Sequence, residues 1–461
     1  MSHNKILNNN RNDYRGIPCD NSKTIKINMK QLLFFVSLSI LSIGSFGQVM
    51  SLQACIDSAV KNNYTVKIAN YDVLQANEKV SEVKAGLMPK INTAIDYRYY
   101  TNLPYQLLPA GVFGGPAGTY KEAQFGVPHN LNANVQLTYP LYNPALKATI
   151  TSIATGTEIA VLQKIKSQED IVMEVSNVYY NAQVLLSQLS FTDSNIVNSK
   201  NLLSIMQLLY QQKMATGTDV QKINLQLAQL QTQKETVESQ YQQVTNILKF
   251  LIGFPQEKNI NIMPHTHSNT NSHQKDDALT EVKLAEKQIN FLQSEKNTLQ
   301  KSKLPIINLN GFYGTTGFAN TDANDFIKFY PLGYAGVQAI LPLYTGNSVK
   351  KKIKGKEIEI EKANTKLAMI KDKNEVDKEN NVYQLNIAKR NLVTIQQQIN
   401  LAQNIYTNTL LQKKEGIATL TDVLQADNAV REAQKNYIDA LIALSRAELE
   451  NKKLTGNLLN K

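Results

Sequence analysis

Two long stretches of the chain carry apolar residues at the alternating three- and four-residue spacings of a coiled coil. Proline is absent between Pro144 and Pro255 and after Pro342, so each stretch can be helical for more than a hundred residues. The first seam consists of Val220, Ile223, Leu227, Leu230, Val237, Tyr241, Val244, Leu248 and Leu251. The second consists of Val423, Ala426, Val430, Ala433, Tyr437, Ala440, Leu444 and Ala447. Because an apolar seam must pack against another helix, the pattern predicts long helices in antiparallel pairs.

Each stretch is expected to contain a long outgoing helix and a return helix. The outgoing helices are predicted at about residues 145–214 and 348–414. About 70 residues at 1.5 Å each gives a length on the order of 100 Å, far beyond the helices of ordinary compact domains. Helices of this length cannot cover their seams within one chain alone, so we expect them to join a larger cylinder.

A short motif, Thr-Asp-Val, marks the expected turn between the two helices of each stretch. A glycine before it would end the outgoing helix, and the Thr-Asp pair would cap the return helix. The tip residues are Gly217, Thr218 and Asp219 in the first stretch and Gly416, Thr421 and Asp422 in the second.

The two stretches belong to a duplicated unit. The Thr-Asp-Val motifs are 421 − 218 = 203 residues apart, and Pro140 and Pro342, each within a Leu- and Tyr-containing strand end, are 202 apart. The predicted division is an N-terminal segment at 1–47, a first repeat at 48–253, a polar linker at 254–277 and a second repeat at 278–457.

Short segments with period-two alternation lie between the helices and predict four strands, at about 90–100, 131–141, 305–314 and 333–342. In the first, Ile91, Ile95 and Tyr97 share one face, opposite Asn92 and Asp96. A small sheet on a soluble domain would show the same alternation. Segments of this length also cross an outer membrane when tilted, and tyrosines near their ends suit an aromatic belt. Four strands in lipid leave two unpaired edges, so such a barrel must be shared between copies of the chain.

The N-terminus indicates export. Residues 29–47 have the basic start, the short apolar run and the small residues of a signal peptide, with a retained anchor as the alternative, and residues 1–28 form an upstream extension. The formal net charge is +11 for the whole chain. Cys55 would be the single cysteine of the mature chain, either a buried helix residue or, in a loosely lipobox-like context, a lipidation site. An exported chain without interleaved basic and aromatic residues argues against nucleic acid as a partner.

Chemistry-bearing clusters are few. His265, His267 and His273 could bind a metal, although their Ser- and Asn-rich surroundings favour a polar linker between the repeats. The lysine run at 350–356 directly follows the last strand and would lie near anionic head groups, near the tunnel entrance, or on a solvated helix start. We find no phosphate-binding loop, nucleophile elbow or cofactor motif, so no enzymatic activity and no cofactor are expected.

Residues 51–457 resemble the outer membrane efflux proteins, the TolC-like family. The opening "SLQACIDSAVKNNYTVKIA", the helix-to-strand "GLMPKI" and the order of the landmarks along the mature chain carry the resemblance. The second tip is also similar, with Gly416, Asp422, Val423, Leu424 and Ala426 at the family's positions.

The resemblance implies a mainly α fold with a membrane β-barrel portion: a homotrimer with one shared 12-stranded barrel in the outer membrane and an α-helical tunnel in the periplasm. It also implies a passive exit duct of a tripartite efflux or type I secretion system, opened by a periplasmic adaptor and an inner-membrane pump. A soluble periplasmic coiled-coil scaffold or adaptor is the alternative function.

In the family, the hairpin tips close the tunnel with acidic rings and polar links. By this resemblance Asp422 is one aperture carboxylate, while Gln425 stands where the family has a second. The Tyr and Arg that can lock the tip are replaced by Lys413 and Ala418, which puts that lock in doubt. Asp219 and Asp422 could instead act only as helix caps.

Overall fold

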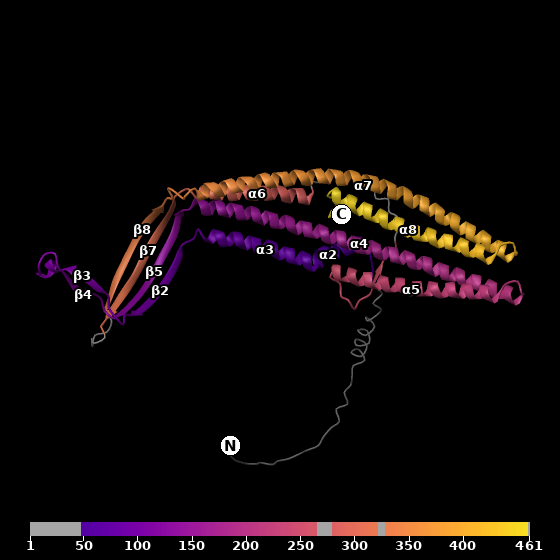
Figure 1. Cartoon of the computed structure of the whole chain (residues 1–461), viewed down its shortest axis with the longest axis horizontal. Helices are drawn as coiled ribbons and strands as arrows, with labels where there is room; N and C mark the ends of the chain where they lie inside the picture. Colours follow the sequence, from indigo (N-terminus) through magenta and orange to yellow (C-terminus); the bar gives the residue numbers. More distant parts are fainter. Residues whose placement is uncertain (1–47, 265–278, 321–327, 460–461) are drawn as a thin grey trace, which may run out of the picture. The chain divides into compact units, whose positions relative to one another are not determined.

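Two long helical hairpins dominate the fold. The computed structural model describes residues 48–264, 279–320 and 328–459. The first hairpin consists of α4 (Pro144–Gln211) and α5 (Gly217–Leu251), and the second of α7 (Ser348–Lys414) and α8 (Leu420–Leu454). Each return helix runs beside the C-terminal part of its long helix (Figure 1). At 68 and 67 residues, α4 and α7 are each about 100 Å long, as expected.

Shorter helices lie beside the parts of α4 and α7 that the return helices leave uncovered. They are α2 (Leu52–Asn62) and α3 (Tyr64–Ala85) against α4, and α6 (Thr280–Lys301) against both α4 and α7 (Figure 1). Each half of the chain therefore runs through helix, two sheet strands, a long helix and a 35-residue return helix. This matched order supports the predicted duplication.

The predicted coiled-coil seams are the buried faces of the return helices. Every seam residue of α5 and α8 is buried or half-buried, and Ile223, Leu248 and Val423 are fully buried. A second buried stripe, with spacings of seven, four, three and four residues, runs along α8, which contacts α4 and α5 of the first hairpin. It contains Asp427, Gln434, Ile438, Leu441 and Ser445. None of the described helices combines the length and apolarity needed to cross a membrane.

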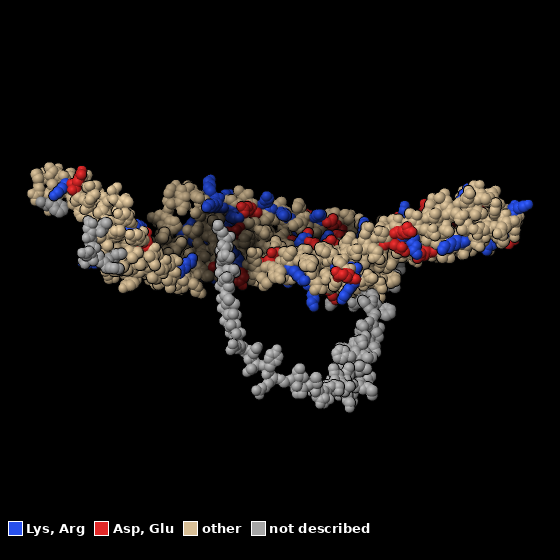
Figure 2. Space-filling view, turned by 90° about the horizontal axis from the view of Figure 1, so that it is seen from below, with Lys and Arg blue, Asp and Glu red and all other residues tan. Residues whose placement is uncertain are grey.

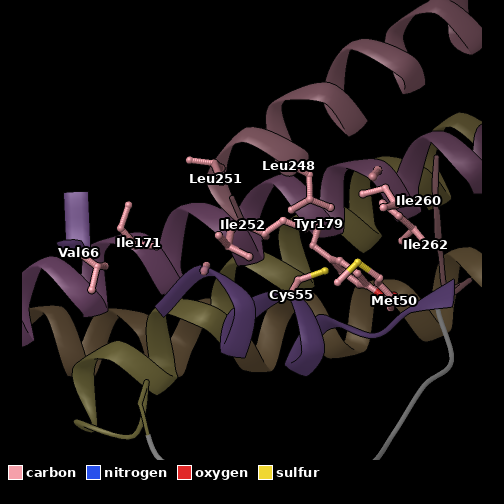
Figure 3. Packing of buried hydrophobic residues seen from close by; sticks show 13 residues of the cluster. Met50, Cys55, Val66, Ile171, Tyr179, Leu248, Leu251, Ile252, Ile260 and Ile262 are labelled. Atoms are coloured by element: carbon pink, nitrogen blue, oxygen red, sulfur yellow. The ribbon is translucent and has the colours of Figure 1, made fainter. Parts of the chain in front are cut away.

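A cluster of buried side chains joins α2, α4 and the end of α5 (Figure 3). Cys55 lies in this cluster with no exposed surface, next to Met50 of β1 (Gln48–Met50) and near Tyr179 of α4. Tyr179 donates its hydroxyl to the Met50 carbonyl at 3.0 Å. The side chain of Asn63, between α2 and α3, donates to the Leu251 carbonyl at 2.8 Å and so satisfies a free carbonyl at the end of α5.

Four antiparallel strands form one sheet in the order β2-β5-β7-β8, with β2 and β8 at its edges. Their bounds are Lys90–Tyr99, His129–Tyr142, Ile306–Ala319 and Lys328–Ile340. The strands therefore lie where alternation placed them, but β7 runs five residues past its expected end and β8 begins five residues before its expected start. Gly314, Gly317 and two threonines interrupt the alternation in β7, and the pairing with β5, which continues from Val135 to His129, keeps it extended.

The strand register aligns the face of β2 that carries Ile91 and Ile95 with alternating apolar positions of the other three strands. Ile95 pairs with Ala133, Val135 with Tyr313, and Leu309 with Val337, so these residues lie on one common face. The opposite face carries Asp96 and Asn132 on β2 and β5, with aromatic residues on β8. Every residue of β8 is exposed, so none of the described helices covers either face at this strand.

Two small pairs of strands lie outside the main sheet. The Gly- and Pro-rich segment between β2 and β5 contains the hairpin of β3 (Tyr105–Pro109) and β4 (Tyr120–Gln124) around the short 3-10 helix η1 (Ala110–Phe113). β6 (Ile260–Ile262) lies in the expected linker, and its Ile260 and Ile262 are buried beside Met50. The predicted signal peptide and His265, His267 and His273 lie outside the described residues.

Candidate functional site: the hairpin tips

The second tip is held by reciprocal hydrogen bonds around Thr419, the N-cap of α8. The Thr419 hydroxyl oxygen accepts from the Asp422 backbone N–H at 3.2 Å. In return, Asp422 Oδ2 accepts from the Thr419 backbone N–H at 2.8 Å and from its hydroxyl at 2.7 Å. This capping box satisfies two backbone donors that a helix start leaves free.

The first tip repeats this arrangement 203 residues earlier. Thr216 caps α5, its hydroxyl oxygen accepts from the Asp219 N–H at 3.2 Å, and Asp219 Oδ2 accepts from the Thr216 N–H at 3.1 Å and hydroxyl at 2.8 Å. The Tyr210 ring covers the start of α5 and lies 3.7 Å from where a Cβ atom on Gly217 would be. The two acidic tip residues therefore have the same local role.

The capping boxes also set the electrostatics of the tips. The Thr419 hydroxyl, followed by its backbone N–H, lowers the pKa of Asp422 below its ordinary value, and Thr216 lowers the pKa of Asp219 in the same way. Lys413 adds a smaller favourable charge to both carboxylates, although it belongs to the second hairpin and Asp219 to the first. Both acids therefore carry their charge over the physiological pH range.

Three sequence expectations about the tips need correction. The N-caps are Thr216 and Thr419, not Thr218 and Thr421, which lie inside the first turns of α5 and α8. Gly217 does not end α4, since it is the first residue of α5; the residue with positive φ in the first tip is Lys213, at 61°. In the second tip Gly416 does take this conformation, with φ of 74°.

The remaining candidate residues are placed on the surface of the tip. Asp422 and Gln425 are exposed and lie three residues apart on the first turns of α8, so they face the same side of the helix. Ile417 is 76 % exposed, which leaves an apolar side chain at the outermost part of the second hairpin.

A buried polar cluster, which the sequence analysis missed, joins the two hairpins above the tips. Gln226 of α5 donates through Nε2 to Asp427 Oδ2 of α8 at 2.6 Å, and Arg431 lies 3.1 Å from the same oxygen. Two turns further along α8, Asn195 of α4 donates to Gln434 Oε1 at 2.8 Å. Burial raises the pKa of Asp427, an effect opposed by Arg431 and Gln226.

The signal for this cluster was present in the sequence. Asp427 and Gln434 are seven residues apart and follow the seam residues Ala426 and Ala433 directly. Assigning one apolar stripe to α8 left them on the solvent side, whereas the contact with α4 buries a second stripe. Among residues 48–264, 279–320 and 328–459, no group of three His, Cys, Asp or Glu side chains is placed to hold a metal ion.

Comparison with known proteins identifies the family of the chain. The chain matches the family model of the outer membrane efflux proteins over residues 55–254 and 277–457. It has no match among curated proteins.

Solved structures share the fold at low sequence identity. The outer membrane protein VceC of Vibrio cholerae is 14 % identical, with a TM-score of 0.69 over 88 % of this chain and 96 % of that one. The CmeC outer membrane channel of Campylobacter jejuni is 13 % identical, with a TM-score of 0.66 over 88 % and 85 %. The open state of the MtrE outer membrane channel of Neisseria gonorrhoeae is also 13 % identical, with a TM-score of 0.66 over 88 % of this chain and 89 % of that one.

The family model covers most of the chain, including both hairpins and the sheet, and favours a channel over the soluble periplasmic scaffold. The family is one of efflux channels and not a class of enzymes. The chain therefore belongs to the outer membrane efflux protein family, as an outer membrane channel whose long helices lie in the periplasm.

Proposed function

We propose that the chain is the exit duct of a tripartite export assembly, in which three copies share one 12-stranded barrel and one helical tunnel. The observation that carries this proposal is the uncovered sheet. Ile91, Ile95 and Val337 are 69 %, 74 % and 66 % exposed on its apolar face. An apolar face of this extent is unfavourable in water and suits hydrocarbon.

The edges of the sheet supply the argument for sharing. β2 and β8 are the edge strands, and hydrocarbon does not tolerate their free backbone N–H and C=O groups. Pairing β8 of one copy with β2 of the next removes both edges when the ring closes. Two copies would give 8 strands and three would give 12, and the resemblance to the TolC-like family favours three.

Transport through such a duct needs an energy source from elsewhere. We assign this role to an inner-membrane pump, joined to the duct by a periplasmic adaptor that contacts the hairpin tips. The exposed side chains of Ile417 and Met214, at 76 % and 61 % exposure, give the tips apolar surface for that contact. Either small molecules or a secreted protein could be the cargo of such an assembly.

The proposed aperture is formed by Asp422, with Gln425 on the same side of α8. In a trimer three Asp422 carboxylates would face one another, and like charges would oppose the lowering of their pKa by the capping box. Such a ring favours cations. Asp219 is proposed to act as a cap alone. The division into repeats at 48–253 and 278–457, joined by a linker at 254–277, is part of the same proposal.

Single-channel recording tests this function. The purified protein, inserted in a planar bilayer, is expected to give a discrete cation-favouring conductance, and Asp422→Asn should reduce the cation preference more than the matched variant Asp219→Asn. Equal effects of the two variants would reject the aperture. Failure of a detergent-stable oligomer to form or insert would reject the duct.

A further inference from the structure

Lysines without acidic partners gather at one end of the sheet. Four stretches that include strand residues and the helix ends joined to them at this end, residues 83–95, 131–157, 296–320 and 329–356, contain no Asp or Glu. Lys296, Lys354 and Lys356 pair with glutamates of α6 and α7. The other lysines of these segments, here called the lysine band, are Lys84, Lys90, Lys147, Lys301, Lys303, Lys350, Lys351 and Lys352.

The topology places the whole lysine band at the same rim of the sheet. Lys90 begins β2, Lys303 lies just before β7, and the band residues of α4 and α7 lie in the first turns after β5 and β8. The antiparallel register puts these strand ends together, since Lys90 lies opposite Thr138 and Ile306 opposite Ile340. All eight lysines are exposed, and among the described residues none has a carboxylate within salt-bridge distance.

Exposed apolar side chains lie directly beside the lysine band. Leu343 and Tyr344, between β8 and α7, are 89 % and 81 % exposed, and Met88 and Ile91, on either side of Lys90, are 62 % and 69 % exposed. In Figure 2 the sheet is mostly free of charged side chains, which become frequent over the helices. Lysines next to an apolar band suit a membrane interface, where the stem lies along hydrocarbon and the ammonium group reaches the head groups.

We propose that the lysine band binds the phosphate groups of anionic phospholipids in the periplasmic leaflet of the outer membrane. This inference rests on the proposed function, because it takes the sheet to span that membrane with its helix-bearing end toward the periplasm. Each band residue contributes a positive charge at head-group depth, where a lysine attracts anionic lipid by about fivefold. Binding would fix the depth of the barrel at the point where α4 and α7 begin.

The absence of tryptophan from the chain allows a sharp test. Tyr344→Trp places a single fluorescent reporter beside the lysine band, and Phe329→Trp places one at the opposite end of β8, both at exposed positions. The full-length protein, as processed by the cell, would be reconstituted in phosphatidylcholine vesicles. Brominated phosphatidylglycerol or brominated phosphatidylcholine is then added as a short-range quencher.

We expect the reporter at position 344 to show about a fivefold higher relative affinity for phosphatidylglycerol than for phosphatidylcholine, unchanged by added inorganic phosphate. The reporter at position 329 should show no preference. Substituting Lys350, Lys351 and Lys352 by Gln should lower the preference at position 344. The matched triple variant K373Q/K389Q/R390Q, with the same charge change further along α7, should leave it unchanged.

The outcomes separate this inference from the proposed function. Equal quenching of the reporter at position 344 by both lipids would overturn lipid binding while confirming that the sheet is in the bilayer. Loss of the preference on adding inorganic phosphate would assign the band to free anions instead. No quenching of either reporter by either lipid would overturn the membrane-spanning sheet and the lysine band with it.

Discussion

The buried bond between Gln226 and Asp427 should determine how firmly the two hairpins hold together. Asp427 is only 3 % exposed, and its carboxylate has Gln226 Nε2 at 2.6 Å and Arg431 at 3.1 Å. Gln226→Leu keeps the approximate size of the side chain but removes the donor. Of the two partners named above, the buried Asp427 carboxylate then keeps only Arg431.

The structure sets the size of the expected effect. A hydrogen bond to a charged group contributes about 1.5–3 kcal/mol, which corresponds to roughly 10- to 150-fold in the equilibrium for local opening. Asp427→Asn keeps an acceptor for Gln226 and removes the cost of burying a charge, so its effect should stay within about 1 kcal/mol. In the Asp427→Asn background, Gln226→Leu should therefore cost less than it does in the native chain.

Hydrogen exchange followed by mass spectrometry measures this opening directly. Peptides covering residues 423–435 of α8 should exchange roughly 10- to 150-fold faster in Gln226→Leu, and the exchange of peptides from the sheet should not change. Gln229→Leu, at an exposed position of the same helix, is the matched control. An unchanged exchange rate at 423–435, or an equal cost of Gln226→Leu in both backgrounds, would refute this account of the bond.

The same cluster should respond to pH with a definite sign. Burial raises the folded-state pKa of Asp427 above its unfolded value, so its ionisation costs stability as pH rises through that window. Gln226 stabilises the ionised form, and the penalty of Gln226→Leu should therefore grow from acidic to neutral pH. In the Asp427→Asn background the penalty should not depend on pH.

Three further predictions concern the caps and Cys55. Thr216→Ala and Thr419→Ala should each loosen the first turn of the following helix by about 1 kcal/mol, measured as faster exchange at the tips. The cap lowers the pKa of Asp422, so ionised Asp422 stabilises the tip fully at pH values above its ordinary pKa, and this stabilisation is lost as pH falls through the lowered pKa. Hydrogen exchange at this tip should therefore rise in acid, and Thr419→Ala should make that rise smaller. Burial raises the pKa of the Cys55 thiol to about 12, so maleimide should label this thiol at neutral pH only after the protein unfolds. Rapid labelling of the native protein would contradict the burial. No labelling even after unfolding would indicate that Cys55 is lipidated.

Long-range features of the fold were the most predictable from sequence. Proline-free stretches and seams of apolar residues depend on repeated spacing over dozens of residues, and they located α7 and approximated α4. The tips were less predictable because Thr216-Gly-Thr-Asp219 offers two threonines as caps. The reciprocal box needs the acid three positions after the cap, which selects Thr216 over Thr218.

Features that depend on partners outside the local segment were missed. β7 remains extended past Tyr313 because β5 and β8 pair with it there, although its own sequence loses alternation. Asp427 is buried because α4 and α5 approach α8 from the other hairpin. The first contact leaves no alternation in the sequence of β7 itself, whereas the second left only the seven-residue spacing of Asp427 and Gln434, which a single apolar stripe on α8 does not explain.

A last prediction follows from combining the apolar seam with the buried polar cluster. Apart from Tyr437, the seam of α8 consists of alanine, valine and leucine at regular spacing, so a shift of one hairpin by seven residues would bury similar apolar surface. The bond from Gln226 to Asp427 forms in one register alone, since a shift would leave a carboxylate buried without its donor. Replacing both residues by leucine should therefore leave stability unchanged or higher, because it removes a buried charge, while register becomes less defined. Spin labels at the exposed positions Asn224 and Asn428 would report this as a broader distance distribution in the double variant. A distribution as narrow as in the native protein would mean that apolar packing alone sets the register.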